Sequence, residues 1–365
     1  MNDLSRTAPS SASSLPRELS IEGAGTTLGL LDYGEPGAAG REGETGEMAI
    51  DSRSDEVRGG QGATSLRGSA GVVVLLHGIR DLAWSMDPIA RALRDGHRVL
   101  SLDLRGHGAS DHPGVYTFPH YAADLHGVLD RLGIERPIFI GHSLGGQVVC
   151  HYAGLFPERA RAVVTIEGLG PPRAPGDDPV EERREQGRAA VEMLAGAGRS
   201  PRRMADVDEA CARVRANHPG LDAGRARFLA ERGTVAVPGG GLRWRWDPRV
   251  QGTWASTTRT ANEERWGWVR CPTLVVTGGR AGGFWRDRRP PNPRPPVGHG
   301  MQDAEDGGMA PDELARRLAC FRGARHVEIA GAGHMVHFDA PNELNRVIAE
   351  FLGSLDDTPR PLPPE

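Results

Sequence analysis

Residues 137–158 read PIFIGHSLGGQVVCHYAGLFPE, and this stretch gives the strongest indication of the fold class. The apolar run PIFI is typical of a buried strand, and GGQVVCHYAGLF is typical of a helix. Between them lies GHSLG (141–145), a G-x-S-x-G at a strand-to-helix turn, which is the context that this motif requires. Such a turn exposes a serine hydroxyl at the carboxyl end of a sheet, where open α/β sheets bind ligands. The sequence therefore predicts that Ser143 is a nucleophile.

Strands and helices alternate on both sides of this turn. The β-branched run GVVVLL (71–76) is typical of a strand that is buried on both faces. This alternation predicts an α/β fold with a mostly parallel, doubly wound sheet. The predicted strands are 18–24 and 26–33 (with a turn near Gly25), 71–76, 98–104, 137–143, 161–167, 271–279 and 326–334, and the predicted helices of the core are 86–95, 120–133, 145–158 and 341–353.

The alternation stops at Gly168 and resumes near residue 271. Residues 171–268 are rich in Arg, Glu and Ala, which predicts a helical cap inserted after the sixth strand. Its expected helices are 179–197, 201–217 and 222–233. The rest of the chain is predicted to form the core, 16–170 and 269–356, with disordered tails at 1–15 and 357–365. Within the core, 35–70 and 281–310 are predicted to be disordered insertions, because they are rich in Gly, Arg, Ser or Pro.

Composition excludes several classes of protein. The chain has 365 residues, 38% of them hydrophobic, and a net charge of −4 with no lysine, so charge gives no reason to expect a nucleic-acid or membrane partner. Four widely spaced cysteines fit neither a zinc site nor a dense disulfide framework. The first 20 residues lack the apolar core of a secretory signal, and no apolar run is long enough to span a membrane. We therefore expect a cytoplasmic protein.

Three further stretches, together with GHSLG, carry a family resemblance: LLHG (75–78), DLRGHGAS (103–110) and GAGHMVHFDAPNELNRVIAEFL (331–352). With them the chain resembles the α/β-hydrolase superfamily, and specifically its cap-bearing serine hydrolases. The resemblance implies that His334, in its Gly-x-Gly-His setting, is the catalytic base. It also implies an oxyanion hole formed by the backbone N–H groups of Ile79 and Leu144.

The acid of the triad is less directly indicated. Many family members carry an Asp shortly after the strand that corresponds to 274–279, but here no carboxylate precedes Asp287. Glu167 ends the strand RAVVTIE, where haloalkane dehalogenases and some relatives carry their acid. We therefore expect Glu167 to be the acid. The alternatives are a carboxylate between Asp287 and Asp306, or an acid elsewhere with Glu167 capping a helix or anchoring the cap.

The resemblance implies acyl transfer through an acyl-enzyme, with no metal or organic cofactor. The expected substrate is a small, largely apolar carboxylic ester. A lactone, an amide or a carbon–carbon bond remains possible for the same triad, and the fold also includes non-catalytic ligand receptors. Haloalkane dehalogenase and epoxide hydrolase chemistry is disfavoured, because those enzymes use an Asp where this chain has Ser143. The sequence leaves the oligomeric state open.

Overall fold

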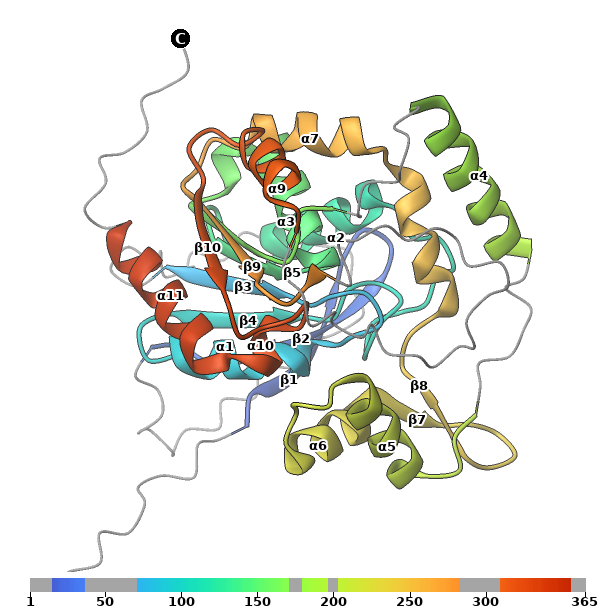
Figure 1. Ribbon diagram of the computed structural model, residues 1–365. Coiled ribbons are helices and arrows are strands. Elements are labelled where there is room, and N and C mark those ends of the chain that lie inside the picture. Colours follow the sequence, from blue (N-terminus) through green and yellow to red (C-terminus); the bar gives the residue numbers. More distant parts are fainter. Residues whose placement is uncertain (1–14, 37–70, 171–178, 196–202, 283–308, 356–365) are drawn as a thin grey trace, which may run out of the picture.

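A computed structural model describes residues 15–36, 71–170, 179–195, 203–282 and 309–355. Its centre is an eight-stranded sheet in the order β1-β2-β4-β3-β5-β6-β9-β10 (Figure 1). The six strands from β4 to β10 are parallel, whereas β1 and β2 form an antiparallel edge. The strands are β1 (Arg17–Glu22), β2 (Thr27–Asp32), β3 (Val72–Leu76), β4 (Arg98–Leu102), β5 (Ile138–His142), β6 (Ala162–Ile166), β9 (Thr273–Gly278) and β10 (Arg325–Ile329).

Helices cover both faces of this sheet, because the parallel strands are apolar on both sides (Figure 1). On one face, α1 and α11 pack with Ile89 and Ile348 against β3, β5, β6 and β9. On the other face, α2 and α3 pack with Leu125 and Val149. The core helices are α1 (Asp87–Leu93), α2 (Phe118–Arg131), α3 (Leu144–Leu155), α9 (Pro311–Leu318), α10 (Val336–Asp339) and α11 (Pro341–Ser354), with short 3₁₀ helices η2 (Ala83–Met86) and η3 (Pro157–Arg159).

The segment between β6 and β9 is mostly helical. It contains α4 (Pro179–Ala195), α5 (Val207–Asn217), α6 (Ala223–Gly233), the hairpin β7 (Thr234–Ala236) and β8 (Leu242–Trp244), the 3₁₀ segment η4 (Pro248–Ser256), and α7 (Arg259–Trp268). Figure 1 shows α5 and α6 beside the hairpin, away from α7. Arg225 of α6 donates to the Trp84 carbonyl oxygen at 2.7 Å, and the Ser256 hydroxyl accepts from the Phe118 N–H at 3.1 Å. These contacts join the segment to the core, and its role as a cap stays a prediction.

The predicted α/β fold is confirmed, and most predicted elements lie within a few residues of the observed ones. Gly25, with φ 71°, lies in the turn between β1 and β2. The helix predicted over 201–217 begins only at Val207, because the Asp206 side chain accepts the N–H of Glu209 and caps the helix there. The predicted disordered segments 1–15, 35–70, 281–310 and 357–365 fall almost entirely outside the described residues.

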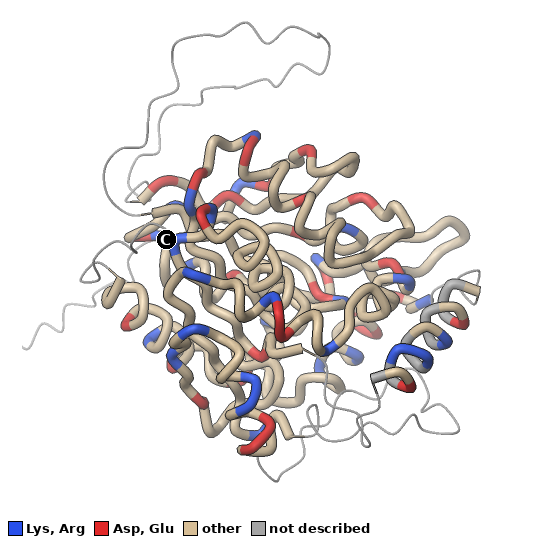
Figure 2. Tube along the Cα trace, turned by 90° about the horizontal axis from the view of Figure 1, so that it is seen from above, with Lys and Arg blue, Asp and Glu red and all other residues tan. Residues whose placement is uncertain are grey.

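Surface charge is mixed. Figure 2 shows acidic and basic residues interspersed over the described trace, in keeping with a net charge of −4. In the described part of the chain, no helix combines the length and the apolarity that a membrane span requires.

Candidate active site

Ser143 lies between β5 and α3 in a strained backbone conformation, with φ 50° and ψ −112°. Two glycines make this turn possible. A Cβ on Gly145 would lie 2.3 Å from the Leu76 carbonyl oxygen, and a Cβ on Gly141 would lie 2.4 Å from the carbonyl carbon of Gly145. Since such distances are far below a van der Waals contact, only glycine fits at either position. The tight turn holds the serine at the carboxyl end of the sheet, as the sequence predicts.

His334 lies between Ser143 and Glu167 and contacts both. Its Nε2 is 3.1 Å from Ser143 Oγ, and its Nδ1 is 3.0 Å from Glu167 Oε2. All three side chains are buried, with Ser143 6% exposed. A carboxylate can only accept, so the ring carries its proton on Nδ1, and Nε2 is left to accept a proton from the serine hydroxyl.

Glu167 is itself held in place from two directions. It follows β6 with φ 51°, and its backbone N–H donates to the Val276 carbonyl oxygen of β9 at 2.8 Å. Its second carboxylate oxygen, Oε1, accepts the backbone N–H of Gly278 at 2.7 Å. This second bond orients the carboxylate so that Oε2 faces His334. The alternative acids between Asp287 and Asp306 lie outside the described residues.

The predicted oxyanion donors, Ile79 and Leu144, flank the serine in different elements. Ile79 follows β3, and Leu144 is the first residue of α3. Among the described residues, neither backbone N–H has a hydrogen-bond acceptor. The loop after β3 is fixed close by, because Gly145 N–H donates to the His77 carbonyl oxygen at 3.1 Å. Within the described ranges both donors are thus without an acceptor, and both lie next to the turn that carries Ser143.

Two neighbouring histidines support this loop rather than the triad. Nε2 of His77 accepts the Leu104 N–H at 3.0 Å, and Nε2 of His107 accepts the Arg80 N–H at 3.0 Å. Burial holds the pKa of His77 well below 6.5 and lowers that of His107 to about 4, so both rings stay neutral. They brace the backbone on either side of Ile79, and Arg80 follows it with φ 60°.

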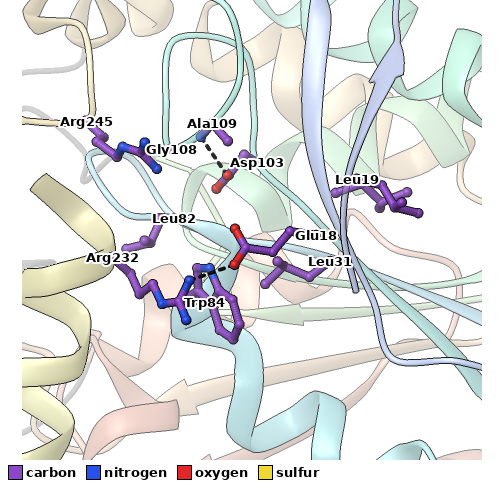
Figure 3. A pocket seen from close by; sticks show the side chains of 11 residues that line it. Glu18, Leu19, Leu31, Leu82, Trp84, Asp103, Gly108, Ala109, Arg232 and Arg245 are labelled. Carbon is purple, nitrogen blue, oxygen red and sulfur yellow. Dashed lines mark hydrogen bonds and ion pairs between the residues drawn. The ribbon is translucent and has the colours of Figure 1, made fainter. Parts of the chain in front are cut away.

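A separate cavity of about 20 Å³, large enough for roughly one water molecule, lies away from the triad. Figure 3 shows Glu18, Trp84, Asp103 and Arg232 around it, with an ion pair between Glu18 and Arg232. Asp103 accepts the N–H groups of Ala83 and Ala109 at 2.6 and 2.9 Å, and burial raises its pKa to about 6. The bonds give Asp103 a structural role in the loop that it begins.

The structure therefore brings together Ser143, His334 and Glu167, and it places Ile79 and Leu144 beside them. Sequence reasoning did not find the orienting contacts. The Gly278 N–H that fixes Glu167 is one of these, and the His142 ring is another, since its Nε2 donates to the His334 carbonyl oxygen at 2.9 Å. A backbone donor has no sequence signal, whereas the position of His142 beside the nucleophile could have suggested a supporting role.

Known proteins are similar to this chain in sequence and in fold. The chain is 29% identical over 280 residues to the esterase YbfF of Escherichia coli, an alignment that covers 77% of this chain and 92% of the relative. It is 27% identical over 326 residues to epoxide hydrolase A of Mycobacterium tuberculosis, covering 79% and 92%.

Among solved structures, the thioesterase domain from the curacin biosynthetic pathway superposes with a TM-score of 0.67. It is 20% identical, and the match covers 92% of this chain and all of that domain, a likeness of fold. The sequence profile of the family described as alpha/beta hydrolase fold matches residues 71–341. The chain therefore belongs to the alpha/beta hydrolase fold family, and it is a hydrolase.

Proposed function

We propose that the protein is a serine hydrolase that cleaves a small, largely apolar carboxylic ester through an acyl-enzyme on Ser143. The observation that carries this proposal is the continuous hydrogen-bonded chain from Ser143 Oγ through His334 to Glu167. A serine hydroxyl is a weak nucleophile until a neighbouring base accepts its proton, and this chain supplies that base in the required orientation.

In the first step, Ser143 Oγ attacks the ester carbonyl carbon while His334 Nε2 takes the hydroxyl proton. Glu167 stabilises the resulting imidazolium and holds its tautomer through Nδ1. The tetrahedral intermediate then collapses, and His334 delivers the proton to the departing alkoxide. A water molecule repeats the sequence on the acyl-enzyme, with His334 first as base and then as acid, and releases the carboxylic acid.

The oxyanion of each tetrahedral intermediate would lie against the backbone N–H groups of Ile79 and Leu144. These groups have no acceptor among the described residues, so a substrate oxygen would not have to displace a protein acceptor. Removal of a comparable donor in other hydrolases costs roughly 3–4 kcal/mol of transition-state stabilisation. Preorganised donors of this kind favour reactions that develop charge on a carbonyl oxygen.

An ester is favoured over the other bonds that this triad can attack. The esterase of Escherichia coli matches this chain along most of its length. The buried triad, with Ser143 6% exposed, favours a substrate small enough to be enclosed. Lactone, amide and carbon–carbon bond hydrolysis would use the same residues in the same order, and they remain the alternatives within this reaction class.

Epoxide hydrolysis is a second candidate because a mycobacterial epoxide hydrolase is similar over most of its length. The nucleophile at the strand-to-helix turn argues against it. Relatives with that chemistry attack through an Asp carboxylate, and this chain has Ser143 in that position with His334 Nε2 3.1 Å from its hydroxyl.

The test is hydrolysis of p-nitrophenyl esters from acetate to octanoate by the wild type and by Ser143→Ala, with styrene oxide as the competing substrate. We expect ester turnover with an optimum at a short acyl chain, and a loss of up to about 10⁶ in kcat for the variant. Turnover of styrene oxide that survives Ser143→Ala, or ester turnover unchanged in that variant, would contradict the proposal.

A further inference from the structure

A second cluster of polar side chains lies beside the triad and takes no part in the proposed reaction. Asp81 lies in the loop after β3, His142 ends β5 and His337 lies in α10, and one ligand atom from each lies within 4.8 Å of the other two. The ring centroids of His142 and His337 are 4.5 Å apart. His142 immediately precedes the nucleophile, and His337 follows His334 by three residues.

Three of the four histidine nitrogens in this cluster are buried and have no hydrogen-bond partner among the described residues. Nε2 of His142 faces the His334 carbonyl oxygen, which can only accept, so the proton of that ring is on Nε2. Its Nδ1 therefore carries a lone pair, and it has no partner. His337 is 1% exposed, and neither of its ring nitrogens has a partner. A buried polar group without a partner destabilises the folded state, which favours an occupant between these nitrogens.

The charge state of the cluster suits a cation. Burial holds the pKa of both imidazoles well below 6.5, so each ring is neutral and can offer a lone pair. Asp81 accepts the Leu82 N–H through Oδ1, and burial raises the pKa of Asp81 to about 7. Arg225, whose charge acts on both Asp81 and His337, is balanced by the Asp87 carboxylate, 3.4 Å away.

We propose that Asp81, His142 and His337 bind a divalent transition-metal ion of the zinc class, and that the bound ion inhibits the hydrolase. Two imidazoles and a carboxylate form a ligand set that zinc accepts with a fourth position left for water. Binding would release the proton of Asp81 where it is protonated. The inhibitory part rests on the proposed function, whereas the site itself does not.

Inhibition follows from where the three ligands lie. Zinc with bonds near 2.0–2.1 Å holds its ligand atoms roughly 3.4 Å apart, whereas the ligand atoms here are separated by up to 4.8 Å. Closing that gap pulls on the loop that follows Ile79, on the residue before Ser143, and on the segment after His334. A shift of about 1 Å in catalytic geometry can lower a rate about 10²-fold.

Binding is measured first, without reference to activity. Metal-free protein is titrated with CoCl₂, whose visible absorption reports coordination by nitrogen and oxygen, and then with ZnCl₂ in competition. We expect one ion per chain in the wild type and in Ser143→Ala and His334→Ala. His337→Phe and Asp81→Asn should weaken binding at least about tenfold. The matched control is His126→Gln, which removes the half-exposed His126–Asp130 pair on α2 and should bind as the wild type.

Inhibition of p-nitrophenyl ester hydrolysis by ZnCl₂ is measured next. We expect wild-type activity to fall at the concentration that saturates binding and to return with EDTA, while His337→Phe resists the same concentration. Equal inhibition of the wild type and His337→Phe, or loss of Co²⁺ binding in His334→Ala alone, would place the metal at the triad and overturn the proposal. Absence of saturable Co²⁺ binding would overturn it as well. Saturable binding in a protein with no ester activity would instead contradict the proposed function and leave the metal site intact.

Discussion

Replacement of Glu167 by Gln tests the orientation of the catalytic base. The backbone N–H of Gly278 donates to one oxygen of Glu167 at 2.7 Å, so a Gln side chain must turn its own oxygen toward Gly278. Its NH₂ group then faces His334 Nδ1, which can no longer donate there. The imidazole responds by moving its proton to Nε2, where it cannot accept the proton of Ser143.

The expected loss is about 10⁴ in kcat/KM, the size seen when an equivalent carboxylate becomes an amide in a serine protease, and this corresponds to about 5.5 kcal/mol. The assay is p-nitrophenyl butyrate hydrolysis at pH 7, with the midpoint of urea unfolding measured in parallel. That midpoint should stay close to wild type, because the bond to Gly278 is retained. Glu328→Gln removes the same charge from an exposed position on β10 and should leave kcat/KM unchanged. A Glu167→Gln enzyme with kcat/KM within tenfold of wild type would contradict the role of Glu167 in orienting His334.

Three further predictions concern stability. Gly145→Ala should prevent folding to a soluble protein, because the new methyl would lie 2.3 Å from the Leu76 carbonyl oxygen; a soluble variant with a wild-type circular dichroism spectrum would contradict this. Asp124→Ala should lower the free energy of unfolding in urea by about 3–5 kcal/mol, because it leaves the buried Arg105 guanidinium, 2.6 Å away, without its carboxylate. A loss below 1 kcal/mol would show that the pair contributes little to stability. Burial lowers the pKa of His151 to about 3, so between pH 7 and 5 this side chain takes up a proton only in the unfolded chain, and stability falls as pH falls. The wild type should therefore lose about 2 kcal/mol more of its free energy of unfolding than His151→Gln over this interval. Parallel pH profiles of stability for the two proteins would contradict the lowered pKa of His151.

Much of the fold could be predicted because its signals are local. The buried parallel strands are continuous apolar runs, and GHSLG places a strand before the serine and a helix after it. The element boundaries in the inserted segment were harder to predict. α7 has low apolar content and is fixed by buried Trp266 and Asn262, contacts that no periodicity reveals. The β7–β8 hairpin has only three residues in each strand, too few for a clear alternation.

The site was predictable in its residue types but not in its geometry. Glu167 could be suggested as the acid because some relatives in the resembled family carry their acid at the end of this strand, yet its 3.0 Å contact with His334, a residue 167 positions along the chain, appears only in the structure. The neighbourhood of His142, His337 and Asp81 could not be predicted from sequence spacing. Those residues meet only because the loop after β3, the end of β5 and α10 converge in the fold.

Covalent labelling is the most direct test of whether Ser143 is the nucleophile. The wild-type protein is incubated with a fluorophosphonate, and intact mass and peptide mapping by mass spectrometry locate the adduct. We expect one phosphonyl group per chain, on Ser143, formed much more slowly in Glu167→Gln and absent from Ser143→Ala. A folded wild-type protein that stays unlabelled, or an adduct on another residue, would contradict the assignment of Ser143 as the nucleophile.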